Sequence, residues 1–71
     1  MSVALATWQM TCNLVTDSAN LNSDAMPELR EKFQQEAKDF CNQAPPQTLD
    51  ESQSRTAEAN RLMSGWNNQT I

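Results

Sequence analysis

Histidine and tyrosine are absent from this 71-residue chain, and glycine occurs once, at Gly65. Without histidine the chain lacks the commonest general base, the usual activator of serine and cysteine nucleophiles, and the imidazole metal ligand. A phosphate-binding loop of the P-loop or dinucleotide type needs several glycines at fixed spacing. Two cysteines are too few for a structural zinc site, which usually has four ligands. The sequence therefore predicts a protein that is not an enzyme and that holds no cofactor and no metal.

Basic residues and long apolar runs are also scarce. Five Lys and Arg stand against nine Asp and Glu, which gives a net charge of −4 and a pI near 4.4. Nucleic-acid affinity comes largely from Lys and Arg, so we expect no nucleic-acid binding. The longest apolar run, Val3 to Ala6, is far shorter than the roughly 20 residues of a membrane span. Met1 is followed by neither a positive charge nor a long apolar run, the two features of a secretory signal peptide. The expected location is therefore the cytoplasm, although a mature secreted chain restarted with Met would look the same.

Large aliphatic residues and Phe are few as well: six Leu, two Val, one Ile and two Phe make 11 of the 71 residues. A chain this short buries a small share of its surface, and its stability is usually marginal. The net charge is too low to keep the chain expanded. We expect a single helical domain over residues 1–71 with a thin core that a second chain could complete.

The clearest helical pattern lies between residues 24 and 43. Its apolar residues recur every three or four positions, which places them on one side of a helix. Pro27 is tolerated in a first turn, and Pro45 and Pro46 end the helix. The members of this stripe are Met26, Leu29, Phe33, Ala37 and Phe40.

A second apolar series predicts a helix over about residues 3–19. Its residues follow a heptad-like spacing, and the first sixteen residues of the chain carry no charged side chain. Met10 and Leu14 lie off this series and widen the apolar face. The Asp-, Asn- and Ser-rich segment that follows, residues 17–24, is typical of a linker. The series consists of Leu5, Trp8, Cys12, Val15 and Ala19.

Thr48 and Glu51 fit a capping box, which predicts a third helix over about residues 48–66 and a loose tail over residues 67–71. Three helices with short links predict an all-α fold: a small antiparallel three-helix bundle, or a helical hairpin plus a third helix, open to completion by oligomerisation. If the chain reverses near Asn22, the levels of Cys12 and Cys41 differ by roughly 13 Å at about 1.5 Å per residue. That exceeds the span of a disulfide, so the sequence predicts free thiols.

The function that follows is a non-catalytic protein–protein interaction module: a small adaptor, chaperone or inhibitor that binds a larger protein through an apolar helical face. The first half of the third helix has few apolar residues, so part of the surface between Phe33 and Phe40 is expected to need cover from another chain. One alternative is a self-assembling structural subunit, such as a homodimer, and a weaker one is an acidic nucleic-acid mimic that blocks a DNA- or RNA-binding protein. Large aromatic residues and Met often dominate interfaces, and the candidate protein-binding residues are Trp8, Met10, Phe33, Phe40, Met63 and Trp66.

Overall fold

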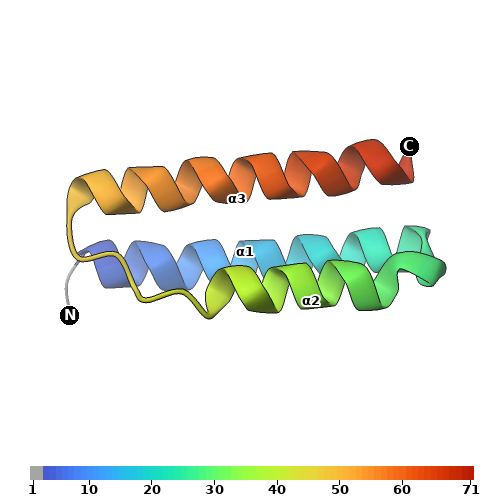
Figure 1. Ribbon diagram of the computed structural model, residues 1–71, viewed down its shortest axis with the longest axis horizontal. Coiled ribbons are helices and arrows are strands. Elements are labelled where there is room, and N and C mark those ends of the chain that lie inside the picture. Colours follow the sequence, from blue (N-terminus) through green and yellow to red (C-terminus); the bar gives the residue numbers. More distant parts are fainter. Residues whose placement is uncertain (1–2) are drawn as a thin grey trace.

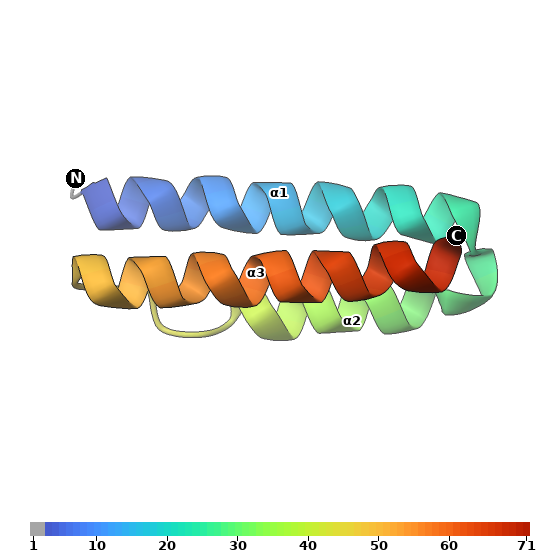
Figure 2. The same cartoon turned by 90° about the horizontal axis from the view of Figure 1, so that it is seen from above.

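The chain folds into three long helices. A computed structural model describes residues 3–71 and contains α1 (Val3–Ala25), the short 3₁₀ helix η1 (Pro27–Leu29), α2 (Arg30–Cys41) and α3 (Leu49–Thr70). α2 runs back along α1, and α3 then runs parallel to α1 (Figure 1). Seen from above, α2 and α3 both lie along α1 (Figure 2). No strand occurs within residues 3–71, so the predicted all-α three-helix bundle is confirmed.

α1 is the helix on which the other two pack. Both α2 and α3 run close to it along their length, whereas α2 and α3 approach each other less closely. The apolar series Trp8, Val15 and Ala19 is buried along this helix. The sequence pattern made residues 24–43 look like the central helix, but that segment is divided between η1 and α2, and the centre of the bundle is α1.

The predicted linker over residues 17–24 is wrong, because α1 continues through it to Ala25. Asn22 and Ser23 are buried there. The Ser23 hydroxyl donates to the carbonyl of Ala19 at 2.6 Å, and the Asn22 amide donates to the carbonyl of Ser18 at 2.9 Å. Side chains of this kind usually favour turns, but here they bond to the preceding turn of their own helix. The chain reverses later, where Pro27 opens η1.

The capping box of the third helix is confirmed in a shifted form. The Thr48 hydroxyl accepts a hydrogen bond from the Glu51 backbone N–H at 3.1 Å. The Glu51 carboxylate accepts from the Gln47 backbone N–H at 3.0 Å, one residue before the cap. These two bonds give α3 a fixed start after the proline-containing loop.

The predicted loose tail is also wrong, since α3 runs through Gly65 to Thr70. The Thr70 hydroxyl donates to the Asn22 side-chain oxygen at 2.8 Å, and the Asn22 amide donates to the Asn67 side-chain oxygen at 3.2 Å. Lys32 donates to Gln69 at 3.0 Å. The last turn is helical because it is tied to α1 and α2, which compensates for its lack of apolar residues.

Two aromatic pairs form the core. The rings of Trp8 and Phe40 lie 5.2 Å apart at 47°, and those of Phe33 and Trp66 lie 5.8 Å apart at 52°. Tilted pairs at these distances add about 0.5–1.5 kcal/mol to their area burial. The buried Trp66 N–H meets no acceptor within residues 3–71, so packing alone holds this ring. Small and medium residues fill the rest of the core, namely Val15, Ala19, Ala37 and Ala59.

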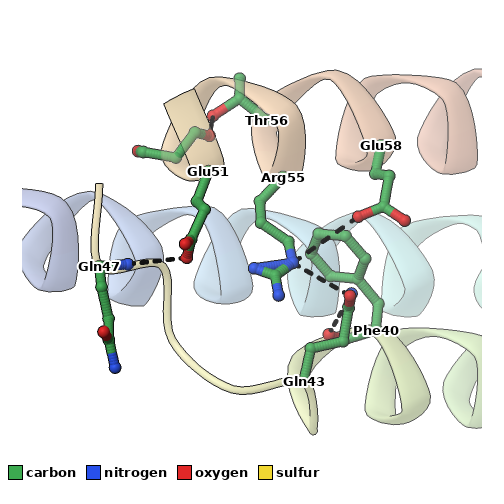
Figure 3. Close-up of polar contacts among 8 residues, drawn as sticks. Phe40, Gln43, Gln47, Glu51, Arg55, Thr56 and Glu58 are labelled. Atoms are coloured by element: carbon green, nitrogen blue, oxygen red, sulfur yellow. Dashed lines mark hydrogen bonds and ion pairs between the residues drawn. The ribbon is translucent and has the colours of Figure 1, made fainter. Parts of the chain in front are cut away.

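Arg55 joins α3 to the end of α2. Its Nε donates to the Gln43 side-chain oxygen at 3.0 Å and lies 3.8 Å from the Glu58 carboxylate (Figure 3). Its guanidinium carbon stands 5.5 Å from the centroid of the Trp8 ring. A cation over an indole face contributes about 0.5–1 kcal/mol at exposed sites and more when water is excluded. The Arg55 side chain on α3 therefore reaches Trp8 of α1 and Gln43 after α2, and so it joins all three helices at that end of the bundle.

Replacement of Asn22 by Ala tests the polar tie between α1 and α3. We expect a loss of about 1–3 kcal/mol in unfolding free energy, because the side chains of Asn67 and Thr70 lose their partner. Amide hydrogen exchange should speed up over residues 67–70 before the rest of α3. The exposed neighbour Asn20, replaced by Ala, is the control and should change neither quantity. Unchanged exchange over residues 67–70 in the Asn22 variant would contradict the assignment.

Truncation of Trp66 tests the aromatic core. Trp66→Ala should lower the unfolding free energy by about 3–5 kcal/mol in urea titrations, a large part of the total for a small domain. Trp66→Phe should cost less, since it keeps a ring against Phe33 and removes the unbonded N–H. Met10→Ala, on the surface, should stay within about 0.5 kcal/mol. Equal losses at positions 66 and 10 would contradict the burial described above.

Candidate protein-binding face

The structure separates the six predicted protein-binding residues into two groups. Trp8, Phe33, Phe40 and Trp66 are buried in the core, and Met63 is half-buried against it. Of the six, Met10 is exposed, with 72 % of its surface open to solvent. The aromatic residues were chosen because large rings often dominate interfaces, but a core this thin uses all of them for its own packing.

The predicted gap over α2 is not present. Phe33 and Phe40 are buried, because Trp66 from α3 covers the first and Trp8 from α1 covers the second. The weak N-terminal half of α3 does not matter here, since Trp8 supplies the cover that α3 cannot. The side of α2 and α3 away from α1 carries a groove lined by Glu36, Asp39 and Arg61 among others. Phe40 and Leu62 also line that groove, but its four charged side chains distinguish it from the apolar surface that was expected.

Within residues 3–71, four of the six exposed large apolar residues lie on α1, and the other two, Leu49 and Ile71, lie at the two ends of α3. Val3, Met10, Leu14 and Leu21 are 83 %, 72 %, 57 % and 71 % exposed. At about 100° per residue, these positions point roughly opposite to the buried face of the same helix. α1 therefore presents apolar side chains on two faces, and the bundle covers one of them.

The exposed residues belong to a regular series. Starting at Val3, steps of four, three, four, three and four residues lead along one face of α1 to Leu21. This alternation is the spacing of a coiled-coil seam. We call this series the outer stripe; it consists of Val3, Thr7, Met10, Leu14, Asp17 and Leu21.

Shallow grooves between α1 and α3 border the outer stripe. One brings Leu14 and Leu21 together with Met63 of α3, and another brings Met10 and Leu14 together with Thr56. Apart from Met63, the α3 residues that line these grooves are polar but uncharged, including Asn60 and Ser64. Met63, half-buried in the first groove, is thus the second predicted residue that reaches this surface.

Charged side chains are unevenly distributed around the bundle. α1 carries two of the fourteen charged residues of the chain, Asp17 and Asp24, whereas the segment Pro27–Cys41 carries seven. Asp24 is paired with Arg30 at 3.0 Å. The side formed by α1 and its border with α3 is therefore the least charged side of the molecule, and Asp17 is the charge that lies within the outer stripe.

The two cysteines are close together, contrary to the predicted separation of their levels. The Cys41 thiol donates a hydrogen bond to the Cys12 backbone carbonyl oxygen at 3.9 Å. The estimate from sequence assumed a reversal near Asn22. The helix continues to Ala25, so Cys12 lies fourteen residues before Met26 and Cys41 fifteen after it. Both thiols are free and half-buried.

Burial raises the pKa of the Cys12 thiol to about 12, and the hydrogen bond and nearby charge of Cys41 act in the same direction. The thiolate is the reactive form of cysteine, so Cys12 is a poor nucleophile near neutral pH. Over residues 3–71, no three thiols or carboxylates gather closely enough to hold a metal ion. Nothing in this region resembles an activated catalytic cysteine.

Comparison with known proteins gives no relative: no protein-family model matches the chain, and neither the curated proteins nor the solved structures contain a match. The sequence contained a signal of the candidate face, because Met10 and Leu14 stood off the buried series, but that signal could not be separated from a wide core face before the packing of α1 was known.

Alkylation kinetics test the environment of Cys12. At pH 8 we expect iodoacetamide to modify Cys12 in the folded chain at least about tenfold more slowly than in urea, where its pKa returns to near 8.5. The rate should rise as the pH increases towards 12, because the thiol loses its proton only there. Peptide mapping by mass spectrometry separates Cys12 from Cys41. Equal rates in the folded and the urea-unfolded chain would contradict the assignment.

Proposed function

We propose that this chain is a non-catalytic protein–protein interaction module that binds another chain through the outer stripe of α1. The observation that carries the proposal is the alignment of four exposed apolar side chains along one helical face, Val3, Met10, Leu14 and Leu21. Single exposed apolar residues are ordinary on protein surfaces. A row of apolar residues with coiled-coil spacing is the form in which helices recognise one another.

The low charge of α1 supports a protein partner over other surfaces. A helix that lies on a membrane typically carries Lys and Arg beside its apolar face, and α1 has neither. Nucleic-acid binding also needs basic residues. None of the helices formed by residues 3–71 combines enough length with enough apolar character to cross a bilayer. The proposal retains the adaptor, chaperone or inhibitor class and the cytoplasmic location expected from the sequence.

The bundle itself supports a binding role for this face. The opposite side of α1 is held by two aromatic pairs and by the Asn22 contacts. The outer stripe is therefore presented on a helix whose position is fixed from behind, which lowers the ordering cost of binding. A partner helix would meet a preformed surface about 27 Å long, from the 18 residues between Val3 and Leu21 at about 1.5 Å per residue.

Site-specific photo-cross-linking in the cell that produces the protein tests this proposal. A benzophenone side chain in place of Met10 should give covalent adducts with a second polypeptide after irradiation. The same group in place of Gln35, which is exposed on α2, is the matched control and should give few or none. Leu14→Glu added to the Met10 probe should abolish the adducts, since a buried unpaired charge opposes docking.

The adduct mass identifies the class of partner: twice the chain mass of 8.0 kDa indicates a second copy, and any other mass indicates a different protein. Absence of every adduct at position 10 under conditions where a partner is present would refute the proposed function.

A further inference from the structure

The order of residues in the outer stripe specifies its partner. This argument rests on the proposed function and adds the identity of the bound chain. Read from either end, the stripe gives the same sequence of chemical types: apolar, polar, apolar, apolar, polar, apolar. An isologous interface requires such self-complementarity, because each surface must match itself after a two-fold rotation. The six positions in order are Val3, Thr7, Met10, Leu14, Asp17 and Leu21.

We infer that the outer stripe binds a second copy of this chain, with the two α1 helices antiparallel. Under a two-fold axis beside position 12, residues whose numbers add to 24 face each other. Met10 then meets Leu14 of the second copy, Val3 meets its Leu21, and Thr7 meets its Asp17. Four apolar layers and two polar layers result, and no apolar residue of the stripe faces a charge.

The single charge in the stripe selects the direction of the second helix. In a parallel pair in register, Asp17 would face Asp17 of the second copy, and like charges in a partly buried layer repel. In the antiparallel pair each Asp17 faces a Thr7 hydroxyl, which can donate a hydrogen bond to the carboxylate. The antiparallel arrangement also places the two helix dipoles in opposite directions, which is favourable. The same residue that would weaken a parallel dimer therefore stabilises the antiparallel one.

The border of the stripe allows a second helix to approach. Thr56, Asn60 and Ser64 of α3 line the grooves beside α1 and bring no charge to the contact. The charged residues of η1 and α2 belong to other elements than the helix that carries the outer stripe. Each copy has a net charge of −4, but the outer stripe contributes one charged side chain per copy, Asp17, to the contact.

Sedimentation of the purified full-length chain across a concentration series from about one to several hundred micromolar tests the second copy. The wild type should reach twice the mass of 8.0 kDa. Leu14→Glu should remain a monomer with unchanged helicity by circular dichroism, because Leu14 is already 57 % exposed in the single chain. Gln35→Glu adds the same charge on α2 and should dimerise like the wild type. A wild-type monomer throughout, or a Leu14→Glu dimer of wild-type affinity, would overturn the inference.

Charge placement at positions 7 and 17 tests the direction. In the antiparallel pair, Thr7→Lys faces Asp17 of the second copy twice, so the dimer dissociation constant should fall at least threefold at low salt. Adding Asp17→Asn to Thr7→Lys should remove this gain. A parallel pair would instead bring the two substituted positions together, and Thr7→Lys would weaken the dimer. That result would overturn the antiparallel arrangement.

The failure of this inference can be told from the failure of the proposed function. If the purified chain is a monomer and the Met10 probe captures a protein of another mass, the partner assignment fails and the binding face stands. If the Met10 probe captures nothing, the proposed function fails as well.

Discussion

The structure depends on two aromatic contacts, one near each end of the bundle. In each contact, a tryptophan indole packs against a phenylalanine of α2. Trp8 of α1 covers Phe40, and Trp66 of α3 covers Phe33. Apart from these four aromatic residues, the fully buried apolar residues are no larger than Val15, so the apolar area buried by the two pairs has to stabilise a core with few large aliphatic residues. This division of the core leaves α1 in contact with both neighbours on one side and free on the other.

The sequence predicted the helical class, the number of helices, the start of α3 and the buried series of α1. Those features rest on local periodicity and on capping residues, whose effects are set within a few positions. Helix ends were the least accurate. Asn22 was expected in a linker because of its turn-forming side chain, and Thr70 in a loose tail after Gly65, yet the two side chains bond to each other across 48 residues. No local pattern reveals a partner at that separation.

The candidate face was missed for a related reason. An apolar residue in a helix can point into the core or into solvent, and the sequence does not say which of two apolar faces the bundle will cover. Trp8 and Trp66 looked like interface residues by their chemistry, but the scarcity of other large side chains required them inside. Met10 and Leu14 were noted as widening a face when they in fact form a second one. The position of the chain reversal, four residues later than expected, also decided that the two cysteines meet.

The unequal contacts among the helices also bear on how the chain reaches this structure. α1 and α2 are joined by the short turn at η1, so their contacts close small loops, whereas α3 meets α1 through residues more than forty positions away. Closing the longer loop costs more entropy. A hairpin of α1 and α2 alone would leave Phe33 without the cover of Trp66, which comes from α3. The side chain of Asn22 holds the final turn of α3, so one amide on the first helix joins that turn to the bundle only when both helices are in place.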